Sequence, residues 1–173
     1  MNRKKIIQTE RLYLTFFDEN MAYQVHLNSI DEDNRKFVPD EVFETEEDAR
    51  NVINDLIECY QTNHGPFVYP ICLKTDETIG YVQAIPINDG WEIGYHIAKK
   101  YTNQGYATEA IKSFIPFIIR KLNISSIQGI CHEDNLASRK VLEKCGFRLI
   151  YQGIDRYQGR DQYVYKYLYK KEM

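Results

Sequence analysis

Two hydrophobic periods, joined by a short glycine-bearing segment, constrain the fold more than any other feature. Over residues 91–98 (Trp-Glu-Ile-Gly-Tyr-His-Ile-Ala), one set of alternate side chains is Trp, Ile, Tyr and Ile, which is the two-residue period of a strand. From Gly105 to Leu122, apolar side chains recur every three or four residues, as in a helix with one buried face. A strand that leads so directly into a long helix predicts a mixed α/β fold.

The remaining patterns predict seven strands and four helices. The expected strands are 11–17, 67–73, 78–87, 91–98, 125–131, 147–156 and 163–170, and the expected helices are 19–28, 45–61, 105–122 and 135–145. Asp18, Thr45 and Asn135 suit helix N-caps, and the polar stretch 31–40 is expected to be a loop. With 173 residues, 43% of them apolar, the chain suits one domain over 1–173 whose core needs no disulfide or metal.

Charge and composition argue against several classes of protein. The 22 Lys and Arg residues against 25 Asp and Glu leave a net charge of −3, which is a poor match for nucleic acid and a better one for a cationic amine. The longest apolar stretch, 114–119, is too short to cross a bilayer, and the first residues lack a signal-peptide core. We therefore expect a cytoplasmic protein without a membrane partner. Neither C-x-x-C nor metal-finger spacing occurs, so no metal is expected, and the cysteines are interpreted as reduced core residues: Cys59, Cys72, Cys131 and Cys145.

The segment 101–110 (Tyr-Thr-Asn-Gln-Gly-Tyr-Ala-Thr-Glu-Ala) has the character of an anion-binding turn. Gly105 permits a positive φ or a close backbone approach, and the free amides of the first helical turn suit phosphate or pyrophosphate. The segment is neither a Walker loop nor a dinucleotide fingerprint, because the Lys-Ser/Thr pair and the three-glycine spacing are missing. Taken alone, it is also compatible with a plain turn.

A second motif, at 135–147, completes a recognisable pair. Asn-Leu-Ala-Ser-Arg-Lys-Val-Leu-Glu-Lys-Cys-Gly-Phe, together with Gly-Tyr-Ala-Thr-Glu-Ala at 105–110, resembles the GNAT superfamily of N-acetyltransferases. The resemblance is to the branch of ribosomal-protein N-terminal (RimJ/RimL-like) acetyltransferases, and it extends from Thr9-Glu-Arg-Leu12 onward. It implies a central mixed, mostly antiparallel sheet of about seven strands flanked by about four helices, and acetyl-CoA as the acetyl donor.

The resemblance also implies which residues hold the donor. In the family, the amides of the glycine-bearing turn cradle the pyrophosphate, the preceding strand bonds the pantetheine arm, and an asparagine reaches the cofactor near its sulfur. Carried over, the binding residues are Ile97, Ala98, Gln104, Gly105, Tyr106, Ala107, Thr108, Glu109, Asn135 and Ser138. Two of them have another interpretation, Asn135 as a helix cap and Ser138 as a solvated helix residue.

Two positions depart from the family pattern. Many members place a tyrosine four residues before the Gly of Gly-Phe and use it to protonate the departing thiolate, but here that residue is Leu142. The acid role is therefore expected to pass to Ser138. Thr102 stands where the wider family has Gln or Arg, which removes one expected pyrophosphate contact.

The chemistry that the resemblance implies also needs a base. The amine must be neutral to attack, yet an α-amine has a pKa of about 8 and a lysine of about 10.4. Glu92 occupies the family position where a base often lies, and His96, on the same strand face, is the alternative. Each also has a structural interpretation, an exposed strand charge for Glu92 and a packed strand residue for His96. Backbone amides near Ile97 are expected to stabilise the oxyanion.

We therefore predict an acyltransferase that moves an acetyl group from acetyl-CoA to a primary amine by direct attack in a ternary complex. The alternative is a non-catalytic acetyl-CoA-binding sensor or regulatory module, which the Leu142 departure keeps open. The acceptor, a protein N-terminus or a small amine, and the state, monomer or homodimer, are left open. An acidic run forms either a solvated helix start or the rim of the acceptor cleft: Glu41, Glu44, Glu46, Glu47 and Asp48.

Overall fold

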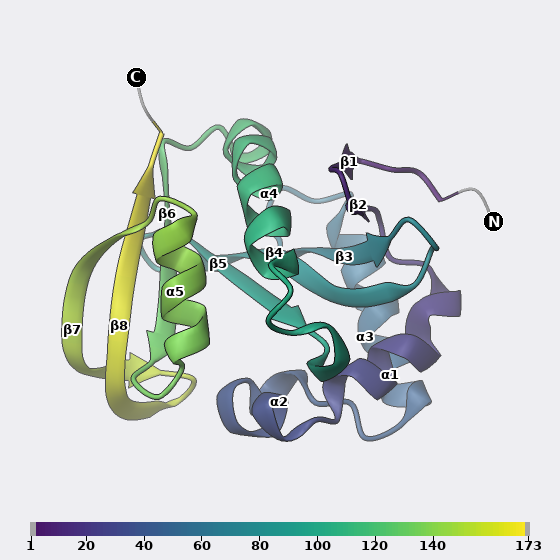
Figure 1. Ribbon diagram of the computed structural model, residues 1–173, viewed down its shortest axis with the longest axis horizontal. Coiled ribbons are helices and arrows are strands. Elements are labelled where there is room, and N and C mark those ends of the chain that lie inside the picture. Colours follow the sequence, from purple (N-terminus) through teal and green to yellow (C-terminus); the bar gives the residue numbers. More distant parts are fainter. Residues whose placement is uncertain (1–2, 172–173) are drawn as a thin grey trace.

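The computed structural model describes residues 3–171 and contains one eight-stranded, mostly antiparallel sheet, in the order β1-β2-β3-β4-β5-β6-β8-β7 (Figure 1). The strands are β1 (Ile7–Gln8), β2 (Leu12–Leu14), β3 (Phe67–Leu73), β4 (Thr78–Ile87), β5 (Gly90–Ile97), β6 (Ser126–His132), β7 (Arg148–Tyr157) and β8 (Arg160–Lys170). The α-helices are α1 (Ala22–Ser29), α2 (Glu32–Phe37), α3 (Glu46–Cys59), α4 (Tyr106–Leu122) and α5 (Leu136–Lys144). Short 3₁₀ helices are η1 (Glu19–Met21), η2 (Pro39–Glu41) and η3 (Lys99–Tyr101). The α/β fold class is confirmed.

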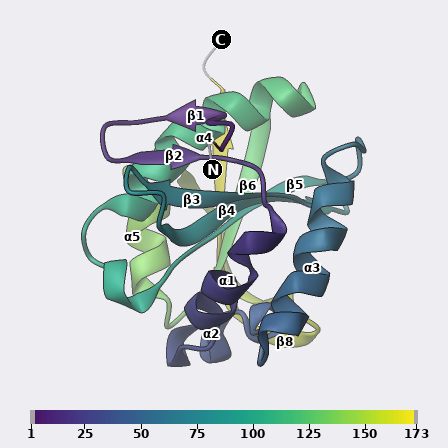
Figure 2. The same ribbon diagram turned by 90° about the vertical axis from the view of Figure 1, so that its right-hand side faces the viewer.

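Helices cover both faces of the sheet, and the alternation of strand side chains divides the core between them. On β2, Leu12 and Leu14 join the cluster that α4 and α5 cover, whereas Tyr13 joins the cluster under α1 and α3. Figure 2 shows α4 on one side of the sheet and α1 with α3 on the other. The molecule therefore has three layers, and a side chain's position along a strand decides which outer layer it contacts.

Predicted helix caps account for the helix starts. Asp18 accepts a hydrogen bond from the Asn20 amide at the start of η1, which runs directly into α1. Thr45 and Asp48 form the full capping box of α3. Asn135 caps α5 by accepting from the Ser138 amide at 3.0 Å.

The prediction of a loop over 31–40 is wrong. This stretch contains α2 and η2, and Asp31 caps α2 by accepting from the Asn34 amide at 2.8 Å. The helix has six residues and, of these, only Asn34 is buried, so it has no apolar stripe that sequence periodicity could detect. The first strand is also shorter than predicted, and β1 was not predicted. Within residues 3–171, no helix is both long enough and apolar enough to cross a membrane.

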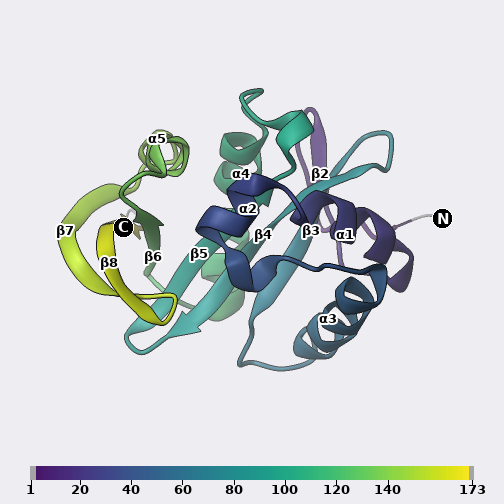
Figure 3. The ribbon, with the colours of Figure 1, turned by 90° about the horizontal axis from the view of Figure 1, so that it is seen from below.

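The sheet opens at its single parallel junction. β5 and β6 pair only through Glu92 with Gln128 and Ile93 with Gly129. Beyond these pairs, β5 stays bonded to β4 as far as Ile97, and β6 stays bonded to β8 as far as His132. The two strands therefore separate while each keeps its other neighbour. The C-terminal strands and α5 lie together at one end of the molecule, away from α1 and α3 (Figure 3).

Candidate active site

A cavity of about 240 Å³ lies where β5 and β6 separate. Its lining includes residues of both strands, of α5, of the segment around η2 and of the β7–β8 turn. Among the predicted catalytic residues, Glu92 and Ser138 line this cavity and His96 does not. The opening in the sheet thus brings together an acid on β5 and a hydroxyl on α5 that are far apart in the sequence.

The residues that line the cavity come from both faces of the sheet. Glu92 and Gly94 lie at positions that face one side of β5, and the side chain of Tyr95 points to the other side. Tyr95 contacts α5, whereas Gln83, which pairs with Gly94, contacts η2. We call the face covered by α4 and α5 the donor side, and the face with Gln83 and Glu92 the acceptor side.

On the donor side, Ser138 is held by a tyrosine. The Tyr95 hydroxyl lies 2.8 Å from Ser138 Oγ and 3.0 Å from the Ser138 carbonyl oxygen. Burial raises the pKa of Tyr95, so this hydroxyl keeps its proton at neutral pH. Asn135 caps α5 and also lines the cavity.

The glycine-bearing turn has the geometry of an anion site. Gly105 is the N-cap of α4 at a φ of +81°, a conformation that favours glycine, and it supplies no capping side chain. The amides of Tyr106, Ala107 and Thr108 therefore have no acceptor within the helix. The Glu109 amide differs, since it already donates to the Gly105 carbonyl at 3.0 Å. Among the predicted amide donors, which run from Gln104 to Glu109, the Glu109 amide is the one that the helix ladder occupies.

Arg11 contacts this turn through hydrogen bonds and an ion pair that were not predicted from the sequence. Its guanidinium bonds the Glu109 carboxylate at 2.7 Å and the Gln104 carbonyl at 2.9 Å, and lies 4.5 Å from the Tyr106 ring centroid. Burial alone would raise the pKa of Glu109, but hydrogen bonds from Thr9 and Arg11 lower it. The Glu109 carboxylate thus serves the N-terminal segment, and Arg11 places a positive charge beside the predicted pyrophosphate site.

The open edge of β5 offers backbone groups, including those of Ile97, for strand-like pairing. The Ala98 amide donates to the Ile79 carbonyl on β4 at 2.8 Å, so this predicted donor is occupied. Because successive backbone groups of a strand alternate in direction, the amide and carbonyl of Ile97 face the side that β6 has left. Ile97 is therefore placed to bond an extended ligand, and Ala98 is not.

On the acceptor side, Glu92 is a carboxyl with an altered pKa. Burial, with the nearby charge of Glu41, raises the pKa of Glu92 from 4.5 to about 7, against the opposing hydrogen bond from the Tyr157 hydroxyl at 3.4 Å. A carboxyl with this pKa is ionised in part of the population at neutral pH and can accept a proton from an amine. The interpretation as an exposed strand charge does not match this burial.

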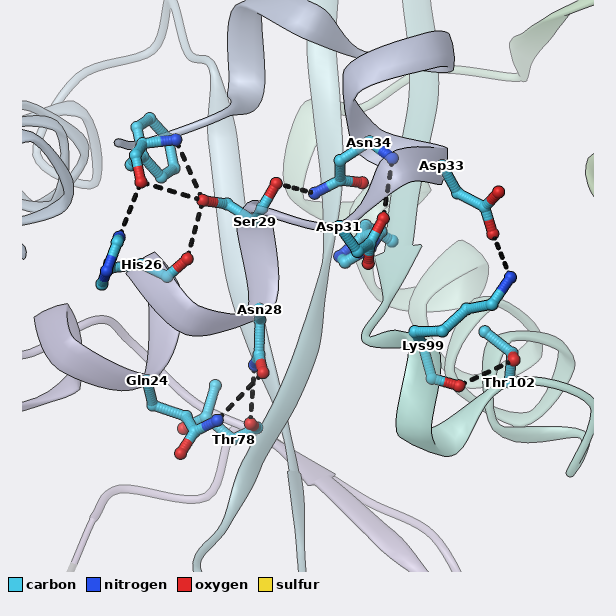
Figure 4. Close-up of polar contacts among 12 residues, drawn as sticks. Gln24, His26, Asn28, Ser29, Asp31, Asp33, Asn34, Thr78, Lys99 and Thr102 are labelled. Atoms are coloured by element: carbon cyan, nitrogen blue, oxygen red, sulfur yellow. Dashed lines mark hydrogen bonds and ion pairs between the residues drawn. The ribbon is translucent and has the colours of Figure 1, made fainter. Parts of the chain in front are cut away.

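His96 has a different partner. Its Nε2 lies 3.5 Å from Asp31 Oδ2, its ring packs beside Tyr81, and burial lowers the pKa of His96 against the opposing charge of Asp31. This contact joins β5 to the start of α2. Two further bonds anchor α2, one from Asn34 to the Ser29 carbonyl and one from Lys99 to Asp33 (Figure 4). The geometry is that of a packed strand residue rather than a cavity base.

Two other residues bear on the predicted chemistry. Leu142 is buried at 1% exposure, and its Cδ2 lies so close to Gly129 that a Cβ there would come within 2.7 Å. It fills core space and does not line the cavity. Cys131 does line the cavity, but burial raises the pKa of its thiol to about 11, so it is protonated at neutral pH. The four cysteines are free, and within residues 3–171 no group of His, Cys, Asp and Glu could hold a metal ion.

The acidic run is divided between the two predicted roles. Glu41 lines the cavity. Glu44 instead pairs with Arg35, Glu46 pairs with Arg50, and Asp48 belongs to the capping box of α3. Most of the run is therefore a solvated helix start, and Glu41 alone reaches the acceptor side.

Comparison with known proteins identifies the family to which this chain belongs. The family model described as the acetyltransferase (GNAT) domain matches residues 11–148. The chain belongs to the GNAT acetyltransferase family. YnaD, an uncharacterized N-acetyltransferase of Bacillus subtilis, is 29% identical over 147 residues, which cover 82% of this chain and 82% of that protein. This GNAT protein is an acyltransferase, and its family uses acetyl-CoA.

Solved structures agree with the fold of this GNAT protein. A GNAT acetyltransferase from Bacillus anthracis has a TM-score of 0.80 at 27% identity, and the match covers 95% of this chain and 97% of that one. RimL, a ribosomal alpha-N-protein acetyltransferase in complex with coenzyme A, has a TM-score of 0.81 at 21% identity, over 97% of this chain and 98% of that one. The likeness to RimL shows the fold alone.

Proposed function

We propose that this GNAT protein transfers the acetyl group of acetyl-CoA directly to a primary amine, with Glu92 as the base and Ser138 as the acid. The observation that carries the proposal is that both side chains line one cavity, whose lining residues come from both faces of the sheet. The donor enters on the donor side and the amine on the acceptor side. The reacting atoms then meet where β5 and β6 separate.

The donor side fits acetyl-CoA. Gly105 at a positive φ leaves three amides of α4 without helical acceptors, which suits a pyrophosphate, and Arg11, paired with Glu109, bonds the Gln104 carbonyl of the same turn. The free backbone edge at Ile97 suits the pantetheine arm, which carries amide groups that pair like an added strand. When bound, acetyl-CoA supplies the thioester carbonyl that the amine attacks.

The chain's own side chains move the protons. Glu92 takes a proton from the attacking amine, and its pKa of about 7 suits that transfer near neutral pH. Ser138 gives its hydroxyl proton to the sulfur that leaves, and Tyr95, within 2.8 Å of Ser138 Oγ, donates its own proton to the serine oxygen in the same step. Solvent then returns a proton to Tyr95 while Glu92 releases the proton of the amine to solvent, so the protons taken and given balance. The three groups thus complete the transfer without an acyl-cysteine, which the protonated Cys131 thiol also disfavours.

An assay of thiol release from acetyl-CoA tests the proposal. The acceptors are peptides that begin with Ala or Ser, spermidine and amino-sugars. We expect at least one amine to release thiol, with intersecting initial-velocity lines, and the double variant E92Q/S138A to lose most of this turnover at saturating substrates. Intact turnover in that variant would overturn the assignment of base and acid. Binding of acetyl-CoA without any thiol release would instead favour a sensor or regulatory module.

A further inference from the structure

A carboxylate on the acceptor side has one oxygen without a protein partner. We propose that Glu41, held by Gln83 over Gly94, binds a second, cationic nitrogen of the acceptor, so that the preferred acceptors are amines carrying a further ammonium group. The inference rests on the proposed function, because it places Glu41 beside the reacting amine. It adds the chemical class of the acceptor, which that function leaves open.

The two oxygens of Glu41 have unequal surroundings. Oε1 accepts a hydrogen bond from Gln83 Nε2 at 2.9 Å, whereas Oε2 is buried and has no hydrogen-bond partner among residues 3–171. A buried polar atom left without a partner costs about 1–3 kcal/mol and is uncommon in folded proteins. Since Glu41 lines the cavity, a ligand in the cavity is the group that can satisfy Oε2.

The orientation of Glu41 is built by residues of two strands. Gln83 is 7% exposed, and a Cβ added to Gly94 would lie 2.7 Å from its Nε2. The Gln83 amide therefore passes directly over Gly94, where a side chain would exclude it. Because Gln83 Nε2 donates to Oε1, the carboxylate is oriented with Oε2 as the free acceptor.

The acidic side chains that line the cavity favour a cationic ligand. Its lining includes Asp40, Glu41 and Glu92, and it includes neither Lys nor Arg. The one basic side chain in the lining is His132, whose Nδ1 accepts from the Asp134 amide at 3.1 Å. A desolvated carboxylate needs a counter-charge, which the protein does not provide here.

Glu92 and Glu41 are proposed to contact two different nitrogens of the acceptor. The reacting nitrogen must lose its proton, which Glu92 takes, so it cannot remain the counter-charge. A second nitrogen can stay protonated and donate to Glu41 Oε2. Burial and the charge of Asp40 raise the pKa of Glu41, and a bound ammonium would hold this carboxyl ionised.

Two acceptors of equal length test the subsite. In 1,4-diaminobutane an ammonium group stands where pentylamine has a methyl group. We expect the native enzyme to prefer 1,4-diaminobutane at least about tenfold in kcat/KM, and E41Q to reduce that ratio to within about twofold. G94A, which displaces Gln83, should reduce the ratio by a second route. E47Q removes an exposed charge of the same acidic run and should leave the ratio unchanged.

A binding measurement separates this inference from the proposed function. Calorimetry follows both amines into the protein saturated with coenzyme A, where no transfer can occur. Tighter binding of 1,4-diaminobutane that is lost in E41Q supports the subsite, even if no amine releases thiol, in which case only the proposed function fails. If the native protein binds and uses both amines equally, or if E41Q and G94A keep the preference, the subsite is overturned and amine transfer is unaffected.

Discussion

The hydroxyl of Tyr95 reaches both the Oγ and the carbonyl oxygen of Ser138, at 2.8 and 3.0 Å. The hydroxyl has one hydrogen, and a carbonyl can only accept. When Tyr95 donates to the carbonyl, its oxygen is free to accept from Ser138 Oγ; when it donates to Oγ, the serine hydrogen is free for the departing sulfur. The pair can therefore switch its direction of donation without moving either backbone.

Removal of these hydroxyls should reduce turnover to different extents. We expect S138A to lower kcat about 100-fold, since it removes the proposed acid, and Y95F about tenfold, since it removes only the group behind it. The KM for acetyl-CoA should change less than about twofold, since neither hydroxyl is proposed to bind the pyrophosphate. Y163F, on β8, is the matched control and should match the native enzyme. An unchanged kcat in Y95F would exclude the relay.

The pKa of Glu92 predicts a pH dependence of turnover. Because this pKa is about 7, kcat/KM should rise with pH as Glu92 ionises and level off above pH 7. E92Q should lose this limb together with most of its activity. The limb should stay in place when the acceptor is exchanged for an amine of different pKa. A limb that moves with the amine belongs to the substrate and not to Glu92.

The same shift predicts a pH dependence of stability. The folded-state pKa of Glu92, about 7, lies above its ordinary value of 4.5, so between these pH values the folded chain holds a proton that the unfolded chain has lost. The contribution of Glu92 to stability therefore falls as pH rises from about 4.5 to about 7. At pH 8, E92Q should unfold with a free energy about 1–3 kcal/mol higher than the native protein. Urea unfolding at pH 5 and pH 8 measures the difference, which should be several-fold smaller at pH 5 than at pH 8.

The turn at Gly105 should govern donor affinity. At a φ of +81°, G105A is strained by about 1 kcal/mol or more, and the amides of the first turn shift with it. We expect the KM for acetyl-CoA to rise about fivefold with little change in kcat. G159A carries the same kind of strain, at a φ of +76°, in the β7–β8 turn. It should lower stability similarly and leave the KM for acetyl-CoA unchanged.

Restoring the family's tyrosine should not restore an acid. Leu142 is buried against Gly129, so L142Y has to force a larger side chain into the core, which costs about 1–3 kcal/mol. We expect a lower melting temperature and no gain in kcat. The decisive background is S138A, in which a rescue of turnover by L142Y would show that the new hydroxyl reaches the sulfur after all.

Local signals explain why most of the fold could be predicted. Asp18, Thr45 and Asn135 are followed by the helices that they cap, and the strand and helix periods of β5 and α4 are long enough to recognise. By contrast, α2 has no apolar stripe and is held by distant groups, such as Gln158, which bonds the Phe37 carbonyl at 2.7 Å. No local pattern of residues 31–40 contains that contact.

For the candidate site, too, local motifs could be predicted from the sequence and distant contacts could not. The turn at Gly105 and the pair Asn135 and Ser138 lie in motifs that a single sequence displays. The partners Tyr95 of Ser138 and Gln83 of Glu41 are each more than 40 residues away along the chain, so only the packing of α5 and η2 against the sheet brings them together. Sequence reasoning thus identified the groups that are proposed to bind the donor, and it missed the side chains that orient Ser138 and Glu41.

The separation of β5 from β6 beyond two residue pairs also has a consequence for how such a protein evolves. The proposed donor contacts come from the start of α4 and from α5, whereas the proposed acceptor walls come from η2, β4 and the β7–β8 turn. Substitutions in one set need not disturb the other, so effects of G105A and E41Q should add in free energy. A lineage could therefore exchange its acceptor by altering short surface segments while it inherits the donor machinery intact.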